Sequence, residues 1–161
     1  MPSNISPILP IVSLLSAFIG AAAALFGHRW RYRADYRNHL VTQLITTITN
    51  VADLSTDYWL MEIHSPSSAN ALEQAKIEAK IEGLVEKLDG SIEIVRPHLS
   101  KIDMLGIDIP ASRFVDALTG GQFSVPARAQ DAERAKEAQA AAAFLILEIS
   151  KAANRRVLGI M

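Results

Sequence analysis

An unbroken apolar stretch dominates the first part of the chain. Residues 8–26, ILPIVSLLSAFIGAAAALF, contain no charged side chain across 19 positions. A helix that rises about 1.5 Å per residue would make this stretch roughly 28 Å long. That length is close to the ~30 Å hydrocarbon core of a bilayer. The pattern therefore predicts an N-terminal transmembrane helix, with residues 1–27 as the membrane anchor.

Small and hydroxyl side chains recur inside this stretch at spacings of three and four, which places them on one helix face. Such a face lets membrane helices approach one another closely. A single span cannot bury its own small face, so the pattern indicates contact between subunits of a homo-oligomer. The face either packs against another helix or lines a narrow pore. Its members are Ser13, Ser16, Gly20 and Ala24.

Helical periodicity continues after the apolar stretch, without proline or glycine from residue 28 to residue 65. Apolar positions spaced by three and four predict that the first helix runs on well beyond the membrane. A loop is expected over residues 65–70. A second helix is expected over residues 71–95, where a regular apolar stripe ends before Pro97. That stripe consists of Ile77, Ile81, Leu84, Leu88, Ile92 and Val95.

The sequence after residue 95 predicts shorter elements. We expect a connector over residues 97–109 and a short helix opened by Pro110, capped by Asp108 and stopped by Gly120 and Gly121. The last helix is expected to start near Pro126, with a solvated first half. No strand alternation or repeat appears. The fold class is therefore all-α: one N-terminal transmembrane helix that continues into a cytoplasmic helical bundle, with residues 38–161 as the cytoplasmic domain.

Five carboxylates stand on one face of the second predicted helix, at spacings of three and four. They repel one another by a few tenths of a kcal/mol per pair. The face is a solvated outer surface, a docking site for a basic partner, or the lining of a cation vestibule in an oligomer. The acidic face consists of Glu78, Glu82, Glu86, Asp89 and Glu93.

Arginines and aromatic residues alternate directly after the apolar stretch, in the segment HRWRYRADYR at residues 28–37. This segment contains four arginines and one acidic residue, Asp35. This composition is typical of a membrane–water interface on the cytoplasmic side, which places the N-terminus outside. The alternative is a basic, aromatic site for single-stranded nucleic acid. The interface residues are Arg29, Trp30, Arg31, Tyr32 and Arg33.

Composition excludes several chemistries. The chain has 161 residues, a net charge of −1 and no cysteine. A disulfide framework, a thiolate nucleophile and a cysteine-ligated metal are therefore excluded. The four histidines do not share a metal-ligand spacing, and no nucleotide-binding glycine loop is present. We expect no catalytic residue, no metal and no cofactor, and hence no enzyme.

In layout, the apolar span at residues 8–26, the HRWRYR edge and the helical remainder resemble the small single-span membrane effectors of bacterial anti-phage systems. The chain is similar to the membrane subunit of Hailong-type defence. The resemblance implies a channel-forming oligomer in the bacterial inner membrane, held closed by single-stranded DNA that a partner nucleotidyltransferase makes. It carries over no ligand residue. Basic residues available to hold a polyanion are Arg96, Lys101, Arg113, Arg128, Lys151, Arg155 and Arg156.

Two functions follow from the sequence. The first is a homo-oligomeric membrane effector, a gated ion channel or pore of a defence system controlled through its cytoplasmic domain. Its partners would be the lipid bilayer, further copies of itself, and a regulatory protein or single-stranded nucleic acid. The second is a membrane-tethered scaffold, in which the span only anchors a helical protein-interaction module.

Overall fold

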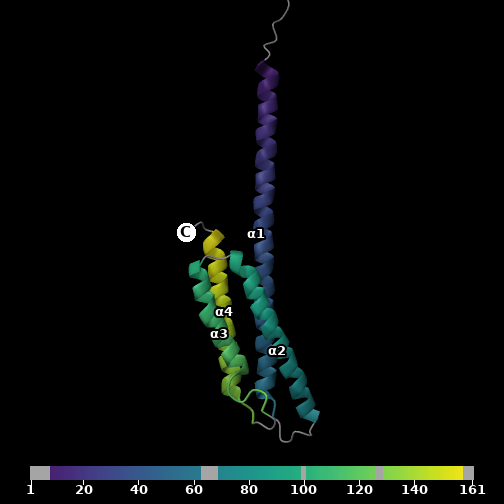
Figure 1. The fold of residues 1–161 in the computed structure, drawn as a ribbon, viewed down its shortest axis with the longest axis vertical. Coiled ribbons are helices and arrows are strands. Elements are labelled where there is room, and N and C mark those ends of the chain that lie inside the picture. Colours follow the sequence, from purple (N-terminus) through teal and green to yellow (C-terminus); the bar gives the residue numbers. More distant parts are fainter. Residues whose placement is uncertain (1–7, 63–68, 99–100, 126–128, 158–161) are drawn as a thin grey trace, which may run out of the picture. The chain divides into compact units, whose positions relative to one another are not determined.

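The chain is all-helical over the residues that the computed structural model describes, which are 8–62, 69–98, 101–125 and 129–157. Side chains at residues 8–14, 69–70, 101–104 and 155–157 lie outside that description. The chain divides into two units, Met1–Arg37 and Asn38–Met161. Figure 1 shows the helices within this part of the chain, in the order α1 (Ile8–Leu60), α2 (Ala69–Val95), the 3-10 turn η1 (Arg96–His98), α3 (Lys101–Thr119) and α4 (Ala132–Val157).

The expected transmembrane helix has no support from the fold. Across the described residues, none of the helices combines the length and the apolar character that crossing a membrane requires. The first seven positions of the predicted span, residues 8–14, have side chains outside the described set. What the structure supports of the predicted fold class is the helical bundle.

Helix α1 forms one continuous element, as the absence of proline and glycine after residue 27 predicted. Within the unit Asn38–Met161, α1 buries the apolar positions that recur at three-four spacing. Leu44, Ile48, Val51 and Tyr58 are each buried. They form one side of the core because a 3.6-residue period returns these positions to the same face.

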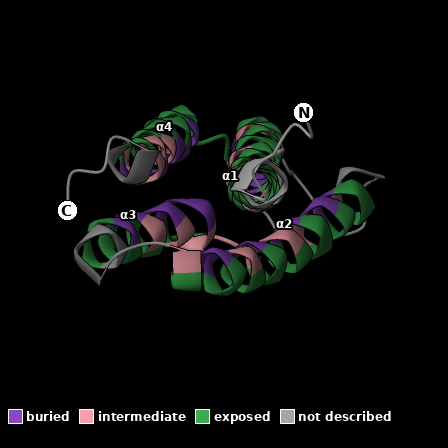
Figure 2. Cartoon of the chain, turned by 90° about the horizontal axis from the view of Figure 1, so that it is seen from above, coloured by how far each residue is buried: buried purple, intermediate pink, exposed green. Residues whose placement is uncertain are grey.

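Helix α2 buries the predicted apolar stripe and ends where Pro97 predicted. Ile81 and Leu88 are fully buried, whereas Leu84 is only partly covered. The helix begins two residues earlier than expected, at Ala69, and passes into η1 at Arg96. In Figure 2 the buried sides of α2, α3 and α4 are turned toward the inside of the bundle.

The prediction for α3 was wrong. A connector and a short helix were expected, but one helix runs from Lys101 to Thr119 with Pro110 inside it. A proline in a helix removes one hydrogen bond and crowds the carbonyl four residues earlier. That carbonyl belongs to Gly106, an exposed residue, so water can reach it. Pro110 itself is buried, and its ring adds apolar contact that offsets part of the cost.

The predicted start of the last helix was also wrong. Helix α4 begins at Ala132, because Asp131 caps it: the backbone N–H of Arg134 donates to Asp131 Oδ1 at 2.9 Å. Ser124, near the expected start, has φ of 60°, which is unlike the extended backbone of an N-cap residue. The first half of α4 is not purely solvated either, since Ala135, Ala138 and Ala142 are buried.

The end of α3 depends on glycine, as predicted, and a substitution there has a definite expected cost. A Cβ on Gly120 would lie 2.5 Å from the Asp116 carbonyl oxygen and 2.5 Å from Nη2 of Arg134. We expect Gly120→Ala to lower the free energy of unfolding by roughly 1–3 kcal/mol, since backbone must shift. Chemical denaturation followed by circular dichroism measures the change.

The matched control is Gly83→Ala in α2, where an added Cβ meets nothing within 4 Å. Alanine should raise stability there by about 0.5–1 kcal/mol, because glycine is a poor helix former. Equal stability changes at the two glycines would contradict the close approach of Arg134 to the end of α3.

Candidate functional site

The predicted small-residue face belongs to the unit Met1–Arg37. Ser16, Gly20 and Ala24 are all exposed in α1, while the side chain of Ser13 lies outside the described residues. A Cβ added at Gly20 would meet nothing within 4 Å. The single chain therefore leaves room at this face for another helix to approach.

Large apolar side chains on the same segment are also uncovered. Phe18 is 79% exposed and Phe26 is 76% exposed, and Leu15, Ile19 and Leu25 are exposed as well. Contiguous apolar surface of this kind on a folded chain marks contact with a membrane, a protein or another copy.

The predicted interface residues follow directly in α1. Arg29, Trp30, Arg31, Tyr32 and Arg33 are all exposed, and Trp30 is 74% exposed. Their exposure fits both predicted roles, the membrane–water interface and the site for single-stranded nucleic acid.

The predicted acidic face divides into two parts. Glu82, Glu86, Asp89 and Glu93 are exposed on α2, whereas Glu78 is half-buried. Within the described residues, the side chains of Glu82, Glu86 and Asp89 form no hydrogen bond or ion pair, so they are available to a basic partner. Glu93 is different, because Arg96 pairs with it at 2.8 Å and with Asp108 at 3.5 Å.

Glu78 belongs to a polar network that sequence reasoning missed. The fully buried Tyr58 donates its hydroxyl hydrogen to Glu78 Oε1 at 2.9 Å, and Gln74 Nε2 donates to the same oxygen at 2.6 Å. The Tyr58 hydroxyl in turn accepts the backbone N–H of Ser124 at 2.8 Å. The network ties the α3–α4 connection to α1 and α2. Its partners lie 20 and 66 residues apart, so no local pattern could reveal it.

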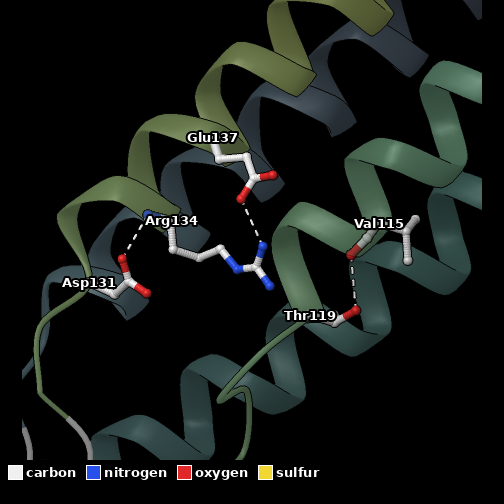
Figure 3. Close-up of polar contacts among 5 residues, drawn as sticks. All are labelled: Val115, Thr119, Asp131, Arg134 and Glu137. Atoms are coloured by element: carbon white, nitrogen blue, oxygen red, sulfur yellow. Dashed lines mark hydrogen bonds and ion pairs between the residues drawn. The ribbon is translucent and has the colours of Figure 1, made fainter.

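Arg134 forms a second arrangement that the sequence did not reveal. Its guanidinium lies 5.7 Å from the centre of the Trp59 ring, in cation–π geometry, and its Nη1 donates to Glu137 at 2.8 Å. Figure 3 shows this side chain extending from α4 toward α3, with Asp131 at the start of its helix. The missing Cβ atoms of Gly120 and Gly121 leave the space that the guanidinium fills.

The surface of the unit Asn38–Met161 has two open hollows. One, of about 570 Å³, is lined by Arg134, Glu137, Asp131 and residues of the α3–α4 connection. The other, of about 480 Å³, lies between α2 and α3, and its lining includes four carboxylates beside Arg96. Within the described residues, no group of three or more His, Cys, Asp or Glu could hold a metal ion.

Charge pairs on α4 are local. Lys136 donates to Glu133 Oε1 at 2.7 Å, and this hydrogen bond, followed by the attraction of the two charges, raises the pKa of the Lys136 ammonium above its ordinary value. Lys151 pairs in the same way with Glu148 at 2.7 Å. Of the basic residues considered for a polyanion, Arg96 and Lys151 are thus engaged with carboxylates. Arg113 is exposed; Arg128 and the side chains of Lys101, Arg155 and Arg156 lie outside the described residues.

The Tyr58 network has a measurable consequence for stability. Tyr58→Phe would leave the Ser124 N–H and the Glu78 carboxylate without their buried partner, so we expect a loss of about 1–3 kcal/mol in the free energy of unfolding. Tyr32→Phe is the control, because Tyr32 is exposed and its change should stay within about 0.5 kcal/mol. Urea denaturation compares the two. A Tyr58→Phe protein as stable as the parent would show that the network contributes nothing.

Comparison with known proteins found no match: no family model, no characterised relative and no solved structure resembles the chain closely enough to place it.

Proposed function

We propose that the protein is a homo-oligomeric membrane effector, a gated channel or pore controlled through the unit Asn38–Met161. The observation that carries the proposal is the exposure of the apolar side chains between Leu15 and Phe26, followed at once by exposed arginines and aromatics. A bilayer covers such a surface, with the arginines at the headgroups.

The described side chains of the uncharged stretch begin at residue 15. Residues 8–14, ILPIVSL, extend that stretch in the sequence toward a membrane-crossing length. The segment would then cross the bacterial inner membrane once, with the N-terminus outside. Because one span cannot cover its own small face, Ser16, Gly20 and Ala24 would meet other copies, as a helix contact or as the pore wall.

The regulator would act on the bundle. The free carboxylates of Glu82, Glu86 and Asp89 favour a partner with a basic surface. The resemblance to Hailong-type effectors implies single-stranded DNA instead, which would need the basic side chains of the unit. The two classes differ in salt dependence and in nuclease sensitivity, so they can be separated once channel activity is measured.

A membrane-tethered scaffold is the second candidate, and the acidic face of α2 favours it. Residues 38–161 contain sixteen acidic and twelve basic residues, and the three free carboxylates concentrate this excess on one helix. A basic protein partner would fit that surface without any channel. This function requires the span only as an anchor.

Membrane potential in cells tests the proposal. A voltage-sensitive dye would be read after induction of the full chain, with and without the gene beside it, and of a version that lacks residues 1–27. Depolarisation by the full chain alone, silenced by the neighbouring gene and absent from the truncated version, is the expected result. A polarised membrane under all conditions, including phage infection, would overturn the channel and favour the scaffold.

A further inference from the structure

The charges that follow the apolar stretch are unevenly distributed around α1, within the unit Met1–Arg37. Three arginines stand four residues apart, so each lies only about 40° around the helix from the one before. Arg31 and Asp35 lie on the other side, about 160° from Arg33, one turn apart and opposite in charge. The excess positive charge therefore lies on one face. This face, which we call the arginine row, consists of Arg29, Arg33 and Arg37.

The described chain does not neutralise the arginine row. Arg29 and Arg33 are exposed and Arg37 is half-buried, and none of the three pairs with a carboxylate of the described residues. The Nε of Arg37 is buried without a hydrogen-bond partner in that part of the chain. Like charges four residues apart on a helix repel one another. An anion beside the row would offset this repulsion, so the arrangement favours a negatively charged partner.

The neighbouring apolar side chains indicate which anion fits. Leu25 and Phe26 are exposed at the end of the apolar stretch, and Arg29 follows Phe26 by three residues in the same unit. A phospholipid joins a phosphate to apolar chains, so one molecule can cover both kinds of surface. A nucleic-acid strand would cover the arginines and leave the apolar side chains in water. The combination favours a lipid.

The aromatic side chains of the segment favour the same partner. Trp30 lies on one side of the arginine row and Tyr36 on the other, about 120° apart around the helix, and Tyr32 lies further round. Proteins that bind single-stranded nucleic acid stack successive bases on aromatic rings along one groove. Rings that are separated by the row do not form such a line. Tryptophan and tyrosine at the edge of an apolar stretch are instead typical of headgroup depth.

We propose that the arginine row binds anionic phospholipid headgroups in preference to zwitterionic ones. This inference rests on the proposed function, since it requires the apolar stretch to lie in a bilayer. Side chains of an α-helix lean toward its N-terminus, which here is toward the apolar stretch, so the long arginine side chains reach back to the headgroups. Each arginine near an anionic surface adds attraction that a zwitterionic surface does not supply.

Trp30 can report which lipids lie beside the row, because bromine on an acyl chain quenches tryptophan fluorescence at close range. The full-length chain would be reconstituted into two sets of vesicles of one composition, phosphatidylcholine with a minor fraction of phosphatidylglycerol. In the first set the phosphatidylglycerol is brominated, and in the second an equal amount of the phosphatidylcholine is brominated. The Trp30→Phe protein supplies the background from Trp59, which is buried.

We expect brominated phosphatidylglycerol to quench Trp30 at least about twofold more than brominated phosphatidylcholine. Arg33→Gln should remove most of this preference, whereas the matched change Arg31→Gln should leave it. Both residues are exposed in α1, and glutamine is a good helix former, so misfolding would not explain a difference. Arg31 is closer than Arg33 to the apolar stretch, so distance from the bilayer alone would give the opposite order.

The outcomes separate this inference from the proposed function. Equal quenching by the two lipids would overturn the preference and leave the membrane contact standing, and quenching by neither would overturn both. A preference that survives Arg33→Gln, or that Arg31→Gln removes equally, would overturn the assignment to the row. Membrane potential decides the channel separately, because a tethered scaffold with this row would show the same preference.

A nucleic-acid arm tests the other partner class. An oligothymidylate would be added to the full-length chain in uncharged detergent, and Trp30 fluorescence would be read as before. We expect no change that depends on Arg33. Quenching by the oligonucleotide that Arg33→Gln abolishes, together with equal quenching by the two lipids, would assign the row to single-stranded nucleic acid and overturn the proposal.

Discussion

Replacing Trp59 by alanine is expected to lower the free energy of unfolding of the bundle by about 3–5 kcal/mol, the cost of truncating a large buried aromatic residue. Trp59 is 1% exposed, and its ring meets Tyr58 edge-on at 4.9 Å and Phe123 at 6.5 Å. Its carbonyl also accepts the backbone N–H of Asp131 at 2.8 Å. Chemical denaturation followed at 222 nm would measure the loss.

The chain provides its own control, because its other tryptophan is exposed. Trp30→Ala should change the stability of the bundle by no more than about 0.5 kcal/mol. Each single-tryptophan protein also reports its site by fluorescence: the Trp30→Ala protein should emit at shorter wavelength than the Trp59→Ala protein. Equal destabilisation by the two substitutions would contradict the buried position of Trp59.

Regular local patterns predicted the parts of the fold that they could determine. The stripe from Ile77 to Val95 returns every three or four residues, so it specifies both a helix and its buried face. Gly121 has φ of +67°, a conformation that glycine adopts readily, so the end of α3 could be predicted as well. These features depend on residues that are close together in the sequence, so a local pattern is enough to predict them.

The mistakes arose where distant contacts override local preference. Pro110 indicated a helix start, but it is a buried residue inside a continuous α3. Asp131 could have been recognised as an N-cap, since an acid precedes a run of strong helix formers, yet Pro126 gave the more familiar signal. The buried alanines of α4 were taken for solvent-facing residues, because alanine fits both environments. Only the packing partner decides which one it occupies.

The candidate surfaces show the same difference between local sequence patterns and distant contacts. The arginine and aromatic residues after the apolar stretch can be recognised from composition, and their role at a membrane interface stays a prediction. That Glu78 is half-buried, unlike the rest of the acidic face, was not predictable, because it hydrogen-bonds with Tyr58, 20 residues away in the sequence. The contact of the Arg134 guanidinium with the Trp59 ring was likewise not predictable, because Trp59 lies 75 positions earlier in the sequence. A surface made of residues that are adjacent in the sequence can be recognised from the sequence. A network between residues that are distant in the sequence can be recognised only in the structure.

The small-residue face is tested most sharply by Gly20→Leu, which should abolish assembly and channel activity if the spans pack through this face. Within one chain the change is tolerated, since a Cβ at Gly20 meets nothing within 4 Å. Between chains, a leucine in place of glycine would hold the helix backbones apart and remove the close contact on which small-residue packing depends. Apparent mass in mild detergent and dye-detected depolarisation are the two measurements.

Ala22→Leu is the matched control, because residue 22 lies 200° around the helix from residue 20 at 100° per residue. It adds a leucine of the same size to the same segment on the opposite side, so it should preserve both assembly and depolarisation. If Gly20→Leu keeps full assembly and activity, the close-packed face is wrong and the span serves only as an anchor. If both leucines abolish assembly, the whole circumference of the segment is in contact, as in a span surrounded by other copies.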